Sequence, residues 1–239
     1  MRSLSIRPGY TAALLALLAF VAGILAQRSL LKHRPVAPPM AREMMAGAPP
    51  QSRFGWFHDF HVQLWQANPR RGDVVLLGDS LTQYGAWDKL LPGVETVNQG
   101  IGGDKLDGLI ARIEAAYVTG ARTAVVTIGT NDIVLGKIDP DRFFAKWTNL
   151  IAELHGHGLA VVVTSIPATM SATFNSTAFP LNARMQAHCA AGACRYVDLN
   201  ATLAPSGLIE GRYTLDGLHF TVGAYRAWAA LLAPDLLSN

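Results

Sequence analysis

The chain has 239 residues, of which half are hydrophobic and 15% are charged, so it can bury a large core and is not disordered throughout. Its net charge of +3 divides unevenly: residues 1–53 hold seven Lys and Arg against one acid, whereas residues 54–239 hold thirteen against sixteen. A nucleic-acid-binding domain carries its positive charge on the folded part, so this distribution argues against nucleic acid as a partner. The two cysteines exclude a disulfide-framework miniprotein and a four-cysteine zinc module.

An apolar segment of 17 residues without a charge runs from Tyr10 to Ala26. At about 1.5 Å per residue, such a helix just spans the hydrocarbon core of a bilayer. Cleavage after Ala26 would place the bulky Ile24 where a signal peptide normally has a small residue. We therefore predict that residues 1–34 form a membrane anchor, with residues 10–26 in the membrane. A cleaved signal peptide and a soluble helix are the alternatives.

Five prolines fall within residues 35–50 and deny this stretch both helix and sheet hydrogen bonding. We predict that residues 35–51 form a semi-rigid, extended linker, with a packed arm as the alternative. The linker would separate the predicted folded domain, residues 52–239, from the membrane. We expect a bacterial inner-membrane protein with this domain in the periplasm, or an exported one. Basic residues after the apolar segment leave the orientation open; they are Arg28, Lys32 and Arg34.

Five short apolar runs alternate with segments of helical periodicity across residues 52–239. Continuous apolar runs are typical of strands covered on both faces, as in a parallel sheet. The expected strands are Asp73–Gly78, Val94–Asn98, Thr123–Gly129, Leu159–Ile166 and Arg195–Leu199. The alternation predicts a three-layer α/β/α sandwich with a mainly parallel five-stranded sheet, preceded by the N-terminal hydrophobic helix.

Apolar residues at helical spacing predict helices between these strands. One predicted helix runs from Leu106 to Tyr117, another from Phe143 to Leu154, and a last one from Val222 to Leu232. Ahead of the first strand, Phe54 to Trp65 predicts an additional helix packed on the domain, with a membrane-surface role as the alternative. The stretch from Ala168 to Pro180 is expected to be a loop that helps to select the substrate.

Two of the strands end in short polar motifs, at the edge where the ligands of such sheets bind. The first strand leads into Gly78-Asp79-Ser80-Leu81, where Ser80 either projects from a tight turn or merely caps a helix. The third strand leads into Gly129-Thr130-Asn131-Asp132. The Asn131 amide can donate to an oxyanion, or it can form a simple Asx-turn.

Two further motifs complete the set. The second strand is followed by Asn98-Gln99-Gly100-Ile101-Gly102-Gly103-Asp104, whose glycines let backbone N–H groups approach a ligand. Neither its spacing nor its place after the second strand fits a dinucleotide site. Near the C-terminus, Asp216 and His219 stand three residues apart. The aspartate can orient the imidazole, or His219 is merely a surface residue.

Together, these motifs resemble those of the GDSL family of SGNH hydrolases. The matching segments are Gly78-Asp79-Ser80-Leu81, Asn98-x-Gly100-Ile101-x-Gly103-Asp104, Gly129-Thr130-Asn131-Asp132 and Asp216-x-x-His219. The resemblance covers the chain from about residue 52 to the end and implies the flavodoxin-like SGNH sandwich. The glycine-rich motif and the aromatic helix are most similar to the platelet-activating-factor acetylhydrolase catalytic-subunit branch.

The resemblance also implies roles for five residues. Ser80 would be the nucleophile, His219 the general base and Asp216 the residue that orients it. The backbone N–H groups of Ser80 and Gly103 and the Asn131 amide would form the oxyanion hole. This set is complete for acyl transfer and implies no metal and no cofactor.

We therefore expect a serine esterase that hydrolyses short-chain, mainly acetyl, carboxylic esters through an acyl-enzyme on Ser80. The short-chain preference follows from the sub-family resemblance alone, and the substrate would be a small-molecule, carbohydrate or lipid ester. A lysophospholipase or thioesterase, or a carbohydrate O-acetyltransferase, would use the same residues. The complete motifs argue against a non-catalytic binding module. Family members can dimerise, but no interface signal is readable, so the oligomeric state stays open.

Other residues of ligand type lie outside these motifs. His155 and His157 flank a glycine at a predicted helix end, which is either a polar terminus or part of a metal site. Cys189 and Cys194 would form a disulfide in an exported domain, with free thiols or a partial zinc site with His188 as the alternatives.

Overall fold

The computed structural model describes residues 53–135 and 138–237, all within the predicted folded domain. The predicted anchor at residues 1–34 and the linker at residues 35–51 lie outside the described residues. None of the helices in the described part is long and apolar enough to cross a membrane.

Five parallel strands form the sheet in the order β2-β1-β3-β4-β5. Their bounds are β1 Val74–Gly78, β2 Thr96–Gly100, β3 Thr123–Thr127, β4 Ala160–Thr164 and β5 Arg195–Val197. Four strands lie within the apolar runs that predicted them, and β2 begins and ends two residues later than the predicted Val94–Asn98. After β1 the chain forms β2 on one side of β1, and it then crosses over to form β3 on the other side of β1. The connections after β1 and β3 therefore run in opposite directions from the carboxyl edge of the sheet. Such a switch point is where open α/β sheets bind ligands.

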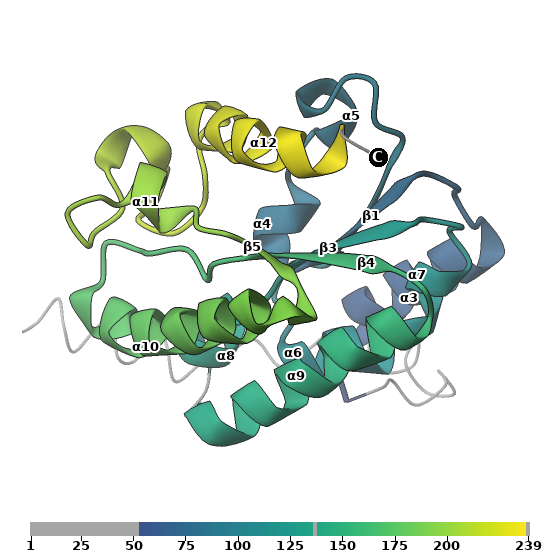
Figure 1. The fold of residues 1–239 in the computed structure, drawn as a ribbon, viewed down its shortest axis with the longest axis horizontal. Coiled ribbons are helices and arrows are strands. Elements are labelled where there is room, and N and C mark those ends of the chain that lie inside the picture. The colour runs from purple at the N-terminus through teal and green to yellow at the C-terminus, as the bar shows by residue number, and fades with distance from the viewer. Residues whose placement is uncertain (1–52, 136–137, 238–239) are drawn as a thin grey trace, which may run out of the picture. The chain divides into compact units, whose positions relative to one another are not determined.

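Helices cover both faces of the sheet, as the sandwich prediction requires (Figure 1). Successive strand residues point to opposite faces, so Val75 and Leu77 enter one core and Val74 and Leu76 the other. The first core is covered by α6 (Leu106–Ala111), α9 (Pro140–Gly156) and α10 (Ala172–His188); the second by α5 (Trp87–Leu90), α11 (Asn200–Leu203) and α12 (Val222–Leu236). The other described elements are α3 (Trp56–Ala67), α4 (Ser80–Gln83), α7 (Glu114–Tyr117), α8 (Thr130–Val134), a π-helical turn (Cys189–Ala193) and a 3-10 turn (Gly211–Tyr213).

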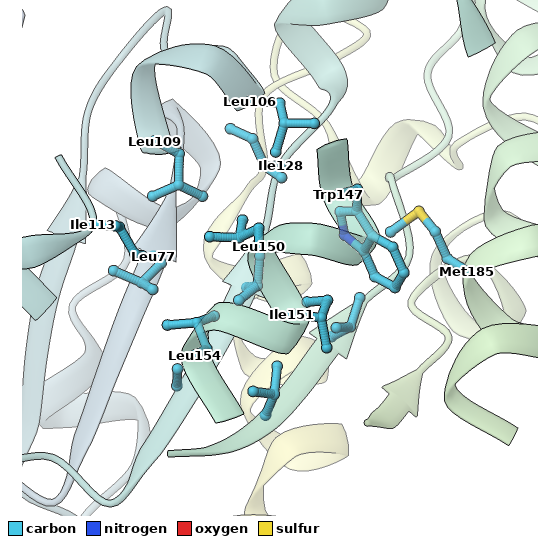
Figure 2. Close-up of a cluster of buried hydrophobic side chains, with 14 of the residues drawn as sticks. Leu77, Leu106, Leu109, Ile113, Ile128, Trp147, Leu150, Ile151, Leu154 and Met185 are labelled. Carbon is cyan, nitrogen blue, oxygen red and sulfur yellow. The ribbon is translucent and has the colours of Figure 1, made fainter. Parts of the chain in front are cut away.

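Helix α9 shows why the spacing of apolar residues predicted a helix correctly. The Asp139 carboxylate accepts hydrogen bonds from the N–H groups of Asp141 and Arg142, and Pro140 starts the helix without an unpaired N–H. Its buried face fills the core between the sheet and α10 (Figure 2). The buried residues recur every three or four positions; they are Phe143, Trp147, Leu150, Ile151 and Leu154. The predictions of α3, α9 and α12 are confirmed in kind and place.

The prediction of one helix from Leu106 to Tyr117 is wrong, because α6 and α7 are separate helices. The break falls at Arg112, whose N–H turns toward the carbonyl of Leu109, three residues back. The Arg112 side chain is buried, and it donates hydrogen bonds to the Asp104 carboxylate and the Gly78 carbonyl instead of reaching solvent. A buried polar contact here overrides a helical pattern that the apolar residues alone would continue.

The prediction of a loop from Ala168 to Pro180 is also wrong, because α10 begins at Ala172. Two buried asparagines on this helix bond the segment that follows β4. Asn182 bonds both the N–H and the carbonyl of Ile166, and Asn175 does the same for Thr169. Polar residues on the buried face interrupt the apolar periodicity, so the sequence pattern concealed this helix.

Cys189, the first residue of the π-helical turn after α10, forms a disulfide with Cys194, which directly follows the turn. His155 contacts a backbone carbonyl of the same turn, and His157 stacks on the ring of Tyr117. Within residues 53–135 and 138–237, no three His, Cys, Asp or Glu side chains are grouped to hold a metal ion. Of the alternatives for these residues, the structure therefore has the disulfide.

Candidate active site

Four of the five residues singled out by the sequence line one cavity of about 570 Å³ at the carboxyl edge of the sheet. Its lining residues are Phe57, Ser80, Gln83, Tyr84, Gly102, Gly103, Asn131 and His219. The fifth residue, Asp216, lines a neighbouring cleft of about 710 Å³ and reaches His219 from that side. The loops after β1, β2 and β3 and a C-terminal turn thus converge at the switch point.

Ser80, His219 and Asp216 form a continuous hydrogen-bonded chain. Ser80 Oγ lies 3.1 Å from His219 Nε2, and His219 Nδ1 lies 2.7 Å from Asp216 Oδ2. The bonds from the His219 side chain and from the backbone N–H groups of His219 and Leu218 lower the pKa of Asp216 to about 2. An ionised Asp216 keeps the proton of a neutral His219 on Nδ1 and leaves Nε2 as an acceptor for the Ser80 hydroxyl.

A short two-stranded turn fixes the position of His219. Thr214 and Phe220 form an antiparallel bridge across it. The Thr214 hydroxyl donates to the His219 carbonyl and accepts from the Gly217 N–H. Gly217 has φ +93, which favours glycine, and its carbonyl accepts a bond from Met170 N–H. The imidazole is therefore held by its own backbone as well as by Asp216.

The exit from β1 fixes Ser80. A Cβ on Gly78 would lie 2.3 Å from the Thr127 carbonyl oxygen, so only glycine lets the chain turn here. Asp79 caps the first turn of α4 by accepting a bond from the N–H of Leu81. The Asp79 side chain is fully buried, and this desolvation raises its pKa to about 7. The Asp79 carboxyl group therefore keeps its proton at pH values at which an ordinary aspartate is ionised.

The loop after β2 offers a backbone donor to the cavity. The Gly102 N–H is taken by Gln83 Oε1 at 2.8 Å, and the Asp104 N–H by the Ile101 carbonyl. Between them, the described hydrogen bonds leave the N–H of Gly103 without an acceptor. Gly103 has φ +80, a conformation that L side chains rarely adopt. Because Gly103 lines the cavity, its N–H can donate a hydrogen bond to a negative charge that develops there.

Asn131 stands at the start of α8 and joins this loop. Its Nδ2 donates to the Asp104 carbonyl at 2.9 Å. Because a side-chain amide carries two N–H donors, one remains for a ligand in the cavity that Asn131 lines. The bond to Asp104 also orients the amide, so its nitrogen and not its oxygen is the atom set next to the Gly103 loop.

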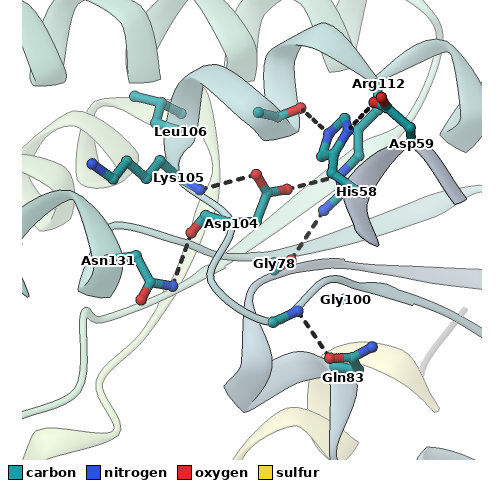
Figure 3. A network of polar contacts seen from close by, with 12 residues as sticks. His58, Asp59, Gly78, Gln83, Gly100, Asp104, Lys105, Leu106, Arg112 and Asn131 are labelled. Atoms are coloured by element: carbon teal, nitrogen blue, oxygen red, sulfur yellow. Dashed lines mark hydrogen bonds and ion pairs between the residues drawn. The ribbon is translucent and has the colours of Figure 1, made fainter. Parts of the chain in front are cut away.

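A buried ion pair beneath the loop was missed by the sequence analysis (Figure 3). Arg112 Nε donates to Asp104 Oδ2 at 2.8 Å, and its guanidinium also donates to the Gly78 carbonyl at 3.0 Å. One side chain thus ties the end of β1 to the loop after β2. Gly108 makes room, since a Cβ there would collide with the Asp104 carboxylate. The one signal available was a charged residue between the apolar positions of a predicted helix.

Known proteins that are similar to this chain indicate its family and its fold. Residues 76–227 match the GDSL-like lipase/acylhydrolase family. A GDSL-like lipase of Bacteroides thetaiotaomicron has a TM-score of 0.64 at 20% identity, covering 76% of this chain and 97% of its own. A Streptococcus pneumonia protein whose description names platelet activating factor has 0.67 at 20%, covering 75% and 91%. The acetylxylan esterase Axe2 of Geobacillus stearothermophilus has 0.56 at 18%, covering 70% and 94%.

One curated relative is matched in sequence, the N-acylneuraminate cytidylyltransferase of Streptococcus agalactiae, at 24% identity over 155 residues. The match takes in 64% of this chain and spans 36% of that relative's length. At these identities the solved structures establish the fold, while the family match covers more than half of the chain. The chain belongs to the GDSL-like lipase/acylhydrolase family and is a carboxylic ester hydrolase.

Proposed function

We propose that this hydrolase cleaves acetyl and other short-chain carboxylic esters through an acyl-enzyme formed on Ser80. The observation that carries the proposal is the hydrogen-bonded chain from Ser80 Oγ through His219 to Asp216, at 3.1 and 2.7 Å. Serine at its ordinary pKa is a weak nucleophile, so an aligned base is what makes attack feasible.

In the first half-reaction, Ser80 Oγ attacks the ester carbonyl carbon while His219 Nε2 takes the hydroxyl proton. The carbonyl oxygen becomes an oxyanion that accepts bonds from the Ser80 and Gly103 N–H groups and the Asn131 amide. As the tetrahedral adduct collapses, the C–O bond to the alcohol breaks and His219 returns the proton to the leaving oxygen. Asp216 stabilises the imidazolium between these two transfers.

In the second half-reaction, His219 takes a proton from water, whose oxygen attacks the acyl carbon. The second oxyanion forms in the same place, and its collapse breaks the bond to Ser80 Oγ. The proton passes from His219 to the serine, and the carboxylic acid leaves. Each donor to the oxyanion contributes about 3–4 kcal/mol of transition-state stabilisation in comparable sites.

The acyl preference rests on two supports of different kinds. The residues carry the acetylhydrolase-like motifs, and two similar folds are named acetylxylan esterases. A second candidate, a lysophospholipase or thioesterase that takes long chains, is favoured by the neighbouring cleft of about 710 Å³. Apolar side chains line much of that cleft, among them Ile133, Val134, Met170, Phe174 and Leu218.

A p-nitrophenyl ester series from acetate to palmitate, with the full-length chain, tests both candidates. We expect kcat/KM to be highest for acetate or butyrate, and Ser80→Ala to fall close to the uncatalysed rate. A maximum at long chains would replace the short-chain proposal with the second candidate. Equal rates for the wild type and Ser80→Ala would refute the acyl-enzyme on Ser80.

We also propose that residues 10–26 anchor the chain in a bacterial inner membrane with the folded domain in the periplasm. The Cys189–Cys194 disulfide supports this, because disulfides persist in oxidising compartments and are rare in the cytosol. A C-terminal alkaline phosphatase fusion tests it, since that reporter folds to an active form outside the cytoplasm. Activity is expected, and an inactive but expressed fusion would contradict the periplasmic location.

A further inference from the structure

Helix α3 lies before the family-matched residues 76–227, yet it borders the catalytic cavity. Phe57 of this helix lines the cavity together with Ser80 and His219. One turn later, the His61 ring packs between the rings of Phe57 and Trp65, at 4.7 and 5.7 Å. The helix thus presents an imidazole, fixed by its aromatic neighbours, to the loops of the active site.

His61 reaches the loop after β2 through one side chain. Gln83 Oε1 accepts a bond from the Gly102 N–H at 2.8 Å, which fixes the orientation of the amide. Gln83 Nε2 then points to His61 Nε2 at 3.3 Å. An amide nitrogen only donates, so His61 Nε2 is the acceptor and its ring is neutral with the proton on Nδ1.

The charges around His61 agree with this protonation state. Partial burial, together with the positive charge of Arg112 on the neighbouring loop and with His58 on its own helix, lowers the pKa of His61. A second proton would place a donor against Gln83 Nε2 and turn the amide away from Gly102. The ring therefore has one state that is compatible with the observed bonds.

The Gly102-Gly103 segment needs such outside support. Two successive glycines have more backbone freedom than any other pair, and Gly103 lies at φ +80. Gly102 directly precedes Gly103 in the chain. The hydrogen bond that fixes the Gly102 N–H therefore limits the directions in which the Gly103 N–H can point. Helix α3 makes a second contact near this segment: Trp65 packs over the guanidinium of Arg112, which is paired with Asp104, the residue after Gly103. The distance from the guanidinium carbon to the ring centre is 5.3 Å.

We infer that α3 is part of the active site and that His61 and Gln83 are positioning residues, which hold the Gly102-Gly103 segment with the Gly103 N–H toward the oxyanion. The inference rests on the proposed function, because the oxyanion is formed only in that reaction. It predicts that catalysis depends on a helix outside the family-matched residues.

The first test replaces Gln83. Gln83→Leu removes both of its bonds, and we expect kcat for p-nitrophenyl acetate to fall about 10- to 100-fold while KM changes by less than about threefold, because the lost interaction acts on the transition state. Gln83→Glu keeps the acceptor for the Gly102 N–H but loses the donor to His61, so we expect kcat to fall about 3- to 10-fold, less than in Gln83→Leu. A residue needed for packing alone would not distinguish the two substitutions in this way.

The second test replaces His61. His61→Phe keeps an aromatic ring between Phe57 and Trp65 but removes the acceptor, so we expect kcat to fall about 3- to 10-fold. The matched control is His157→Phe, whose ring can still stack on Tyr117. His157 lies between the end of α9 and the start of β4, at the opposite edge of the sheet from this loop, so we expect the wild-type kcat. All variants are measured as the full-length chain.

Hydrogen–deuterium exchange of the peptide covering residues 100–105 gives a readout that does not need activity. Gln83→Leu should speed exchange there at least threefold and the most of all the variants, Gln83→Glu and His61→Phe should speed it to a smaller extent, and His157→Phe should not change it. Unchanged exchange and unchanged kcat in Gln83→Leu would overturn the inference while leaving the esterase proposal intact. A wild type no faster than Ser80→Ala would overturn the proposed function, and exchange would still decide whether α3 positions the loop.

Discussion

His219 carries a hydrogen bond on each side of its ring, and the two partners differ in kind. Ser80 offers a neutral hydroxyl, whereas Asp216 is ionised, with a pKa lowered to about 2 by bonds from the His219 side chain and two backbone N–H groups. The Asp216 side chain is more than half exposed, so its effect comes from these bonds and not from burial. In the proposed mechanism, Asp216 orients the ring and stabilises its positive charge after His219 takes the proton from Ser80.

Asp216→Asn tests this role. An amide can present a donor to Nδ1 and favour the tautomer that blocks proton uptake at Nε2, so we expect kcat for p-nitrophenyl acetate to fall about 10²- to 10⁴-fold. The two backbone bonds to Oδ1 can remain, so the thermal midpoint should change little. A kcat within twofold of the wild type would show that His219 is oriented by its backbone alone.

Asp79 makes stability depend on pH in the direction opposite to an ordinary surface carboxylate. Its pKa is raised from 3.8 to about 7 in the folded chain, so unfolding releases a proton between these values. The unfolded state is therefore favoured as pH rises from about 4 to about 7, and the cost is constant above that. At about 1.4 kcal/mol per pKa unit, the total amounts to a few kcal/mol.

Asp79→Asn removes this ionisation. We expect the unfolding free energy of the variant, relative to the wild type, to increase between pH 4.5 and 7.5 in urea titrations. Asp88→Asn, at an exposed position on α5, is the matched control for the same substitution at a carboxylate outside the core. A difference that is flat with pH for Asp79→Asn would mean that Asp79 is ionised in the folded chain.

At the scale of elements, the site depends on how the loops after β1 and β2 are joined. The guanidinium of Arg112 bonds both the Gly78 carbonyl and Asp104, and Asn131 bonds the Asp104 carbonyl from the third loop. Three loops that are far apart in sequence thus meet at Asp104. The donors of the cavity are held relative to Ser80 by this buried pair.

Arg112→Met leaves the Asp104 carboxylate buried without its partner, and we expect a loss of about 3–5 kcal/mol in the unfolding free energy. Adding Asp104→Asn should recover part of that loss, because the uncompensated charge is gone. The matched control is Arg122→Met, whose ion pair with Asp73 is exposed and should contribute less than about 1 kcal/mol. Equal losses for the two arginines, measured in guanidinium chloride, would contradict the role of Arg112.

At the scale of the whole molecule, one covalent link adds to the packing of the two cores. The Cys189–Cys194 bond closes a short loop, with a sequence separation of 5, so it removes little freedom from the unfolded chain. It therefore supplements a fold that the sheet and its covering helices already define. The disulfide also supports the proposed periplasmic location, because disulfides persist in oxidising compartments.

The double variant Cys189→Ser/Cys194→Ser should lose about 2 kcal/mol of unfolding free energy, the value expected for so short a loop. Dithiothreitol should lower the stability of the wild type by a similar amount and leave the double variant unchanged. A wild type that does not respond to the reductant after full reduction, checked by thiol titration, would show that the link does not stabilise the folded state.

The sequence by itself determined the fold class, the five strands and the five residues of the candidate site. Apolar runs report burial directly, and motifs such as Gly78-Asp79-Ser80-Leu81 keep their chemistry within a few adjacent positions. Asp216 and His219 were found for the same reason, because three residues along one turn bring the carboxylate to the ring.

Only the tertiary structure decided what holds those residues in place. Arg112, Gln83 and His61 act on partners far away in the chain, and their own neighbours in sequence give no sign of it. The same cause hid α10, where Asn175 and Asn182 are polar because they bond the segment after β4. A local pattern records which side chains avoid water, but a buried polar group is explained by its partner, and the partner is chosen by the fold.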